Sequence, residues 1–268
     1  MINFKIILDQ SLAFILKNYT KKFSITTYGN IGWYWLSGFE QVINNGVATY
    51  FAVDYGSSAS SRIVIFNQHW VYKRYHNLPY NYTYTTKYVG GYFYFTSNDY
   101  FYKTDLSFNL IAHSNIKDAY YRQCAYDPKN SKFYVSARSL NRIDVYDTSC
   151  SLLHSINLAA EIPHAIAFFN ENIYVGLWYS IEILVLKNDL VTNNITISEC
   201  TSSIFSITMD QFGYMAISCL SNYLITVYDS NGISKNTGIS TSNPSHITSI
   251  DSSGRFVIMA GNSLDIYF

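Results

Sequence analysis

With 268 residues, the chain is long enough for one large all-β domain or for two smaller domains. Lys plus Arg and Asp plus Glu number 18 each, so the net charge is zero and no basic surplus indicates a nucleic-acid partner. No apolar run reaches the roughly 18 residues that cross a bilayer. Aromatic residues make up 18% of the chain, which favours strands because aromatic side chains fit a half-buried pleated surface.

Residues 1–22 are apolar but contain Lys5, Asp9 and Gln10, and they lack the features of a signal peptide. The chain is therefore expected either to stay inside the cell or to be the mature part of a longer protein. N-glycosylation sequons at three asparagines permit secretion, and between these alternatives we favour an extracellular protein. The sequons lie at Asn18, Asn81 and Asn194.

Short apolar segments separated by polar turns follow along the whole chain, and each is expected to form a strand. In chain order these strands lie at 4–8, 12–15, 23–28, 33–36, 39–43, 48–54, 62–67, 70–75, 82–89, 91–96, 100–105, 108–113, 133–137, 142–147, 152–158, 164–169, 173–178, 181–186, 190–197, 214–219, 224–229, 255–260 and 263–268, with further strands near 122, 204 and 247.

A repeat of about 40 residues organises these strands. Polar residues that end the first strand of successive units lie 40 to 43 residues apart, at Asp127, Asn170, Asp210 and Asp251. Four strands in each such unit are typical of a β-propeller blade, which buries its apolar faces by stacking on its neighbours. We therefore predict an all-β fold in which residues 1–268 form a single β-propeller domain.

The N-terminus decides the number of blades. Aligning residues 7–15 with 208–217 gives seven blades, of which the last has only three strands, and this is the count that we predict. In the alternative there are six blades, and residues 4–8 close the last one. An incomplete last blade would leave a free strand edge between Asp265 and Phe268, and such an edge invites pairing with another chain.

Two motifs resemble known propeller repeats. Residues 163–167 (PHAIA) with 172–175 (NIYV), and residues 141–147 (NRIDVYD), resemble NHL-repeat and YVTN-type propellers. The resemblance covers residues 120–268 well and residues 1–119 poorly. It implies the fold and leaves the function open. In such propellers, ligands usually sit over the central channel, on the face that carries the loops before first strands and after second strands.

The candidate ligand-binding residues are those expected at these loop positions. They are a mixed polar and aromatic set: Asp54, Tyr55, Asn98, Asp99, Arg138, Asn141, His164, Trp178, Tyr179, His246 and Asn262. Trp178 and Tyr179, like a tyrosine cluster between Tyr72 and Tyr84, offer flat amphipathic faces for recognition. The simpler explanation of the cluster is that tyrosine is the favoured strand residue of this protein.

From these observations we predict a binding or scaffold module for a protein or carbohydrate ligand, with no catalytic residue, bound metal or cofactor. In one alternative, the protein is a propeller hydrolase or lactonase whose oxygen ligands to a divalent cation are drawn from Asp54, Asp99, Asn141 and Asn262. Ordinary turn capping also explains those residues. In another, the protein is an extracellular structural protein that self-assembles through its free edge.

Histidines and cysteines add two further expectations. His164 and His246 stand at nearly equivalent repeat positions, where a pair could hold a metal or act as a base, although shared ancestry explains the spacing as well. The cysteines show no CxxC spacing, so zinc is not expected. They are also too few for a disulfide scaffold, and buried free thiols are the simpler prediction. They are Cys124, Cys150, Cys200 and Cys219.

Overall fold

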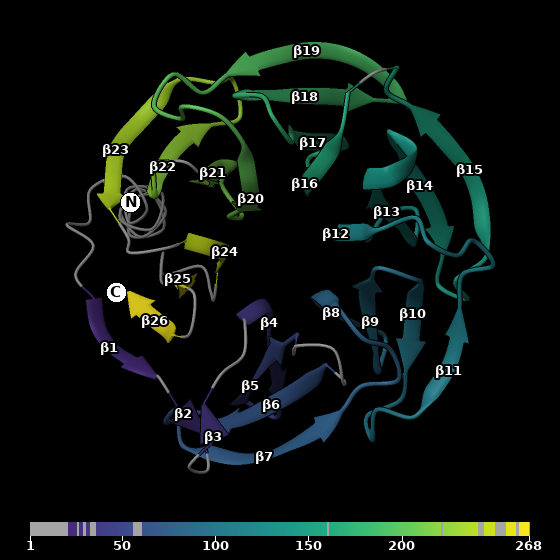
Figure 1. The fold of residues 1–268 in the computed structure, drawn as a ribbon, viewed down its shortest axis with the longest axis vertical. Helices are drawn as coiled ribbons and strands as arrows, with labels where there is room; N and C mark the ends of the chain where they lie inside the picture. Colours follow the sequence, from purple (N-terminus) through teal and green to yellow (C-terminus); the bar gives the residue numbers. More distant parts are fainter. Residues whose placement is uncertain are drawn as a thin grey trace, which may run out of the picture.

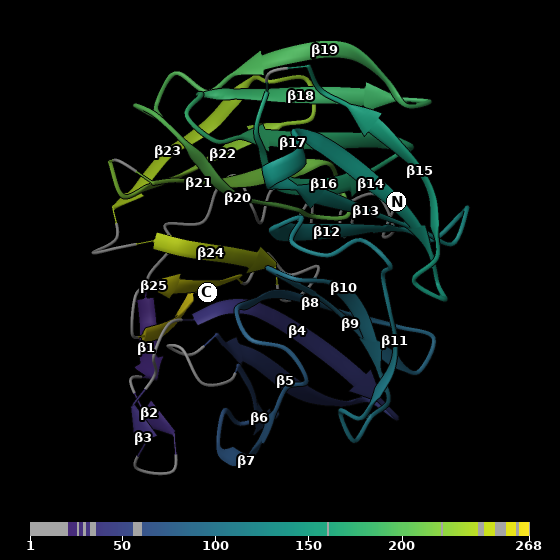
Figure 2. The same ribbon diagram turned by 45° about the vertical axis from the view of Figure 1, so that its right-hand side comes forward.

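The computed structural model describes residues 21–25, 27–28, 31–32, 36–55, 61–159, 161–220, 222–240, 244–249, 256–260 and 263–267. These residues form a β-propeller of six four-stranded antiparallel blades around a central channel (Figure 1). The blades follow one another in chain order around the ring, as the turned view also shows (Figure 2). The predicted all-β propeller is therefore confirmed, and the predicted count of seven blades is wrong.

Each blade is named here by its innermost strand. The first three consist of β4 (Leu36–Asn44), β5 (Val47–Asp54), β6 (Arg62–Asn67) and β7 (Tyr72–Asn77); β8 (Thr83–Val89), β9 (Tyr92–Ser97), β10 (Phe101–Thr104) and β11 (Leu110–His113); and β12 (Tyr121–Asp127), β13 (Lys132–Ala137), β14 (Arg142–Asp147) and β15 (Leu152–Asn157). A short 3-10 helix, η1 (Arg138–Leu140), joins β13 to β14.

The next two blades consist of β16 (Pro163–Phe169), β17 (Asn172–Leu177), β18 (Glu182–Lys187) and β19 (Leu190–Thr196), and of β20 (Ile204–Met209), β21 (Tyr214–Cys219), β22 (Leu224–Asp229) and β23 (Ser234–Ser240). The last contains β24 (Pro244–Ser249), β25 (Phe256–Ala260), β26 (Ser263–Tyr267) and, from the start of the chain, β1 (Lys21–Ile25). A two-stranded ribbon of β2 (Thr27–Tyr28) and β3 (Ile31–Gly32) lies between β1 and β4 in the sequence.

The two ends of the chain close the ring within one blade. Strand β1 runs antiparallel to β26, with Ser24 opposite Asp265 and Ile25 opposite Leu264. The closing strand is therefore Lys21–Ile25, not residues 4–8, which lie outside the described residues. Because β26 pairs with β25 on its other side, the edge predicted to be free is occupied. The strand through which self-assembly was hypothesised, β26, is therefore paired on both sides.

Carboxylate-capped turns explain why the repeat is visible in the sequence. Oδ1 of Asp210 accepts hydrogen bonds from the backbone N–H groups of Phe212 and Tyr214, at 2.8 and 2.9 Å. An aspartate favours such a turn because its side chain replaces a backbone acceptor. The same pattern of bonds, to the second and fourth residues after the carboxylate, follows third strands at Asp105, Asp147 and Asp229.

The core lies between neighbouring blades. Ala165 and Tyr174 of the β16 blade pack in one cluster with Ile204 and Met215 of the β20 blade. Several buried tyrosines lie in such clusters, and the hydroxyl of the fully buried Tyr102 lies 2.8 Å from Thr83 Oγ1. Buried hydroxyls with partners make tyrosine usable as a core residue. Within the described residues, no helix combines the length and the apolar character needed to cross a bilayer.

The cysteines divide into one disulfide and two thiols. Cys200, in the turn after β19, is bonded to Cys219 at the end of β21, with Cα atoms 5.3 Å apart, so the bond joins two neighbouring blades. The prediction of free thiols is wrong for this pair. It is correct for Cys124 and Cys150, which are free and buried.

We expect both free thiols to be inert in the folded protein. Burial raises the pKa of Cys124 to about 11 and that of Cys150 to about 12, so both stay protonated at a pH of about 8 and the reactive thiolate is scarce. Alkylation with iodoacetamide, followed by intact mass, should add no group to the native protein. After unfolding without reductant, the reagent should add two groups, one on each of the two free thiols. Unfolding with reductant should expose all four cysteines to the reagent. Modification of the native protein would contradict the burial.

Candidate ligand-binding site

A β-bulge recurs near the start of every innermost strand. In β16, Pro163 pairs with Leu177 and Ala165 pairs with Gly176, so His164 is the extra residue. A bulge turns its extra side chain out of the normal alternation of the strand. The equivalent residues in the other five blades are Ser37, Tyr84, Arg122, Phe205 and Ser245, with Gln123 sharing the bulge in β12.

Five of the bulge residues line a pocket of about 210 Å³ at one end of the channel. This pocket is called the channel mouth. It lies on the face predicted from the resemblance, because innermost strands begin and second strands end there. Its lining comes from five blades: Ser37, Tyr55, Tyr84, Arg122, Arg138, His164, Trp178 and Phe205.

Two guanidinium groups in the mouth are supported by aromatic rings. Arg122 lies over Tyr84, with its Cζ 4.0 Å from the ring centroid, and Arg138 lies over Trp178 at 4.3 Å. These are cation–π contacts, which strengthen as the groups lose water. Burial, followed by repulsion from Arg122, lowers the pKa of Arg138. The mouth is therefore a positively charged site held by rigid rings.

His164 fixes one wall of the mouth. Its ring stacks on Trp178 at 4.6 Å, and its Nδ1 lies 3.0 Å from the carbonyl oxygen of Phe205. Because a carbonyl only accepts, Nδ1 carries the proton of this hydrogen bond. The carbonyl of His164 accepts a bond from Ser136 Oγ of the preceding blade at 3.0 Å. The histidine is thus a packed and positioned part of the site.

The predicted equivalence of His164 and His246 is off by one residue. In β24, His246 pairs with Met259 and Pro244 pairs with Ala260, so His246 corresponds to Ala165. The bulge position of that blade belongs to Ser245. The two histidines therefore hold different positions in the backbone register of their blades. A joint role for the two histidines stays a prediction.

Four of the predicted candidates line the mouth, namely Tyr55, Arg138, His164 and Trp178. Asn98 supports it from behind, because its Oδ1 accepts a hydrogen bond from the Tyr84 hydroxyl at 2.9 Å. Tyr179 is 75% exposed beside Trp178, at a ring distance of 5.6 Å. Asn141 ends η1 with a left-handed backbone and caps a turn. Asn262 lies outside the described residues, and for His246 only the backbone is described.

Two of the predicted oxygen ligands, Asp54 and Asp99, already have other polar neighbours. Asp54 is buried, and its carboxylate forms an ion pair with the guanidinium group of Arg62 at 2.5 Å. Asp99 lies beside Asp118, and burial, together with a hydrogen bond to that neighbour, raises the pKa of Asp99. Among the residues that the structure describes, no three His, Cys, Asp or Glu side chains cluster as a metal site would require. The described members of this set therefore act in turns and ion pairs.

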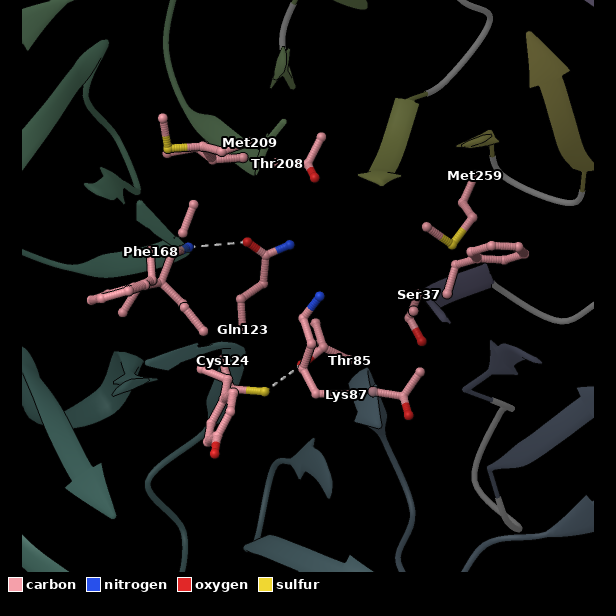
Figure 3. Close-up of a pocket in the computed structure, with 17 residues that line it drawn as sticks. Ser37, Thr85, Lys87, Gln123, Cys124, Phe168, Thr208, Met209 and Met259 are labelled. Atoms are coloured by element: carbon pink, nitrogen blue, oxygen red, sulfur yellow. Dashed lines mark hydrogen bonds between the residues drawn. The ribbon is translucent and has the colours of Figure 1, made fainter. Parts of the chain in front are cut away.

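The other end of the channel carries a second pocket of similar size, about 210 Å³ (Figure 3). Gln123 and Lys87 point into it (Figure 3), and Gln123 bridges blades by donating to Ser206 Oγ at 2.9 Å and accepting from the Ile166 N–H at 3.1 Å. Lys87 lies 3.6 Å from Glu40, whose charge raises the lysine pKa. This cation already has a carboxylate partner, unlike the guanidinium groups of the mouth.

The candidate set predicted from the sequence leaves out four residues of the mouth, of which only Tyr84 was considered, as part of the tyrosine cluster, and the sequence holds a signal for them. Each is the second residue of an innermost strand, and two of them stand five residues before a turn aspartate, Arg122 before Asp127 and Phe205 before Asp210. What hid them was the bulge, since a regular strand would direct these side chains elsewhere. The missed residues are Ser37, Tyr84, Arg122 and Phe205.

Two of the three sequon asparagines are described, and both are exposed. Asn81 lies in the turn before β8, and Asn194 lies on the outermost strand β19. Asn18 lies outside the described residues. Glycosylation at these positions stays a prediction.

Comparison with known proteins adds no family. No protein-family model and no curated protein matches the sequence. The resemblance to NHL-repeat and YVTN-type propellers therefore stays a prediction, and the geometry of the mouth is the basis for the function.

Proposed function

We propose that this propeller is a binding module, NHL-like in its repeats, and that its ligand occupies the channel mouth. The observation that carries the proposal is the convergence of polar and aromatic side chains from five blades on one pocket, by means of the same bulge in each innermost strand. A concave site with a few fixed polar groups is the usual form of a ligand site.

The aromatic groups of the mouth favour recognition over a purely structural role. Tyr55 stacks on Tyr84 at 5.5 Å, and Trp178 contacts Phe205 at 5.9 Å, so rings from four blades surround the pocket. Rigid aromatic side chains lose little conformational freedom on binding, which is why they are enriched at recognition surfaces. A protein segment or a carbohydrate is the class of ligand that such a site suits.

An extracellular location is part of the proposal. The Cys200–Cys219 disulfide supports it, because such bonds persist mainly in oxidising compartments. The exposure of Asn81 and Asn194 is compatible with it.

The test is a glycan array and a peptide display library probed with the wild-type protein and two variants. Trp178→Ala should weaken binding to the enriched ligands by about 30-fold or more, as expected for a central aromatic residue. Tyr92→Ala is the matched control, since Tyr92 begins β9 at the end remote from the mouth. An absence of enriched ligands, or equal weakening by the two variants, would remove the proposed function.

A further inference from the structure

We propose that the ligand presents a carboxylate to the channel mouth, where Arg122 and Arg138 bind it. This inference rests on the proposed function and names the chemistry that the site recognises. Three observations support it: the positive charge of the mouth, two buried donors without an acceptor, and aromatic rings whose faces already contact other side chains.

The charge of the mouth is uncompensated by carboxylates. Among the described residues, no ion pair is formed by Arg122 or Arg138, whereas Arg62 and Arg142 each pair with an aspartate. The contacts that Arg122 and Arg138 do make are to tyrosine hydroxyls and ring faces. Two neighbouring cations without a counter-charge repel each other, and an anion between them removes that cost.

Two buried donors in the mouth have no acceptor among the described residues. They are Nε of Arg122 and Nε1 of Trp178. Both residues line the pocket. Burying a donor without an acceptor costs about 1 to 3 kcal/mol, so a ligand that supplies an acceptor here gains binding free energy. A carboxylate only accepts, which matches a site whose unused groups are all donors.

The rings of the mouth support the cations rather than offering free faces. Cζ of Arg138 lies 4.3 Å from the ring centroid of Trp178, and the ring centroid of His164 lies 4.6 Å from that of Trp178. Tyr84 likewise carries Arg122 at 4.0 Å and Tyr55 at 5.5 Å. A neutral sugar that needs an open aromatic face therefore finds these two rings already in contact with protein groups. An anion instead uses the indole N–H of Trp178 and the N–H groups of the guanidiniums that lie over the two rings.

A carboxylate fits this donor set better than a phosphate does. Guanidinium forks bind the two oxygens of a carboxylate in a planar, paired geometry. Phosphate sites usually add a cradle of backbone N–H groups at a glycine-rich turn or a helix N-terminus. The lining of the mouth includes neither glycine nor lysine. The carboxylate can come from an acidic side chain or from a sugar acid, and the experiment separates these sources.

The experiment measures binding by calorimetry with pairs of similar ligands in which only one member carries a carboxylate. The pairs are glucuronate with glucose, for a sugar source, and the N-acetyl amides of glutamate and glutamine, for a side-chain source. At least one acid should bind with a Kd of about 10 mM or tighter, and at least about tenfold better than its neutral partner. Inorganic phosphate, as a third probe, should bind more weakly than that acid.

Arg122→Gln and Arg138→Gln should each lower the affinity for the acid by at least about tenfold. Arg74→Gln removes the same charge from the exposed outer strand β7 and should leave binding unchanged. If a variant does not fold, the wild-type protein still gives a test, because binding must weaken as salt rises. Equal binding of acid and neutral partner, tighter binding of phosphate, or no acid binding would overturn the inference. Neutral ligands bound at the mouth would then leave the proposed binding function standing.

Discussion

Removing residues 1–25 should destabilise the propeller strongly and make it associate. The deletion takes away β1, which pairs with β26 at four positions, and the half-buried Ile25, which packs on the cluster containing Leu36 and Leu264. Ladder hydrogen bonds contribute about 1 kcal/mol each and the apolar burial adds about 1 to 2 kcal/mol, so several kcal/mol are lost. We expect Tm to fall by about 10 °C or more.

The control for this experiment removes residues 1–20 and keeps β1. Only the longer deletion exposes the edge of β26, so only that variant should show a scattering mass that rises with protein concentration. Equal Tm values for the two deletions, with both proteins monomeric, would contradict closure of the ring by β1. Self-assembly through β26, one of the alternatives drawn from the sequence, therefore requires that this edge first be opened.

Gly38→Ala should have the second largest effect, because it forces two blades apart. A Cβ at Gly38 would lie 2.8 Å from the carbonyl oxygen of Tyr84 and 2.9 Å from Cα of Thr85. Both atoms belong to the backbone of β8, so no side-chain rotation can relieve the clash and the strands themselves must move apart. We expect a loss of about 3 kcal/mol, which corresponds to a fall in Tm of at least about 6 °C in thermal unfolding. Ligand binding at the mouth should weaken too, since Ser37 and Tyr84 are neighbours of the contact.

Gly46→Ala is the matched control for this substitution. Gly46 lies in the turn between β4 and β5 with a φ of +76° and no atom near the site of a Cβ. An alanine there bears only the strain of a left-handed backbone, about 1 kcal/mol. If the two substitutions cost the same, close approach of β4 to β8 is not what requires glycine at position 38.

The repeat, and with it the class of fold, could be predicted from local signals. Asp127 and Asp210 mark strand ends because an aspartate caps its own turn through bonds to residues two and four positions ahead, or to nearby N–H groups in the same turn. Apolar segments between such turns predict strands. The innermost strands expected near 40, 84, 122, 165, 204 and 247 all lie where the structure has them. These features depend on residues close in the sequence.

The number of blades and the membership of the site depended on contacts between distant residues. Ile25 pairs with Leu264 across nearly the whole chain, and no local pattern distinguishes an outer closing strand from the start of another blade. The disulfide between Cys200 and Cys219 likewise required the positions of two blades.

At the mouth, the strand order together with the resemblance to known propeller repeats placed Tyr55, Arg138, His164 and Trp178 among the candidates at one end of the channel. That Arg122 and Tyr84 also line the mouth followed from the three-dimensional structure alone. The physical reason is the bulge, because one extra residue reverses which side of a strand a side chain points to. Hydrogen bonds such as that from Ser136 to the carbonyl of His164 join this bulge to the neighbouring blade, and that blade is distant in the sequence.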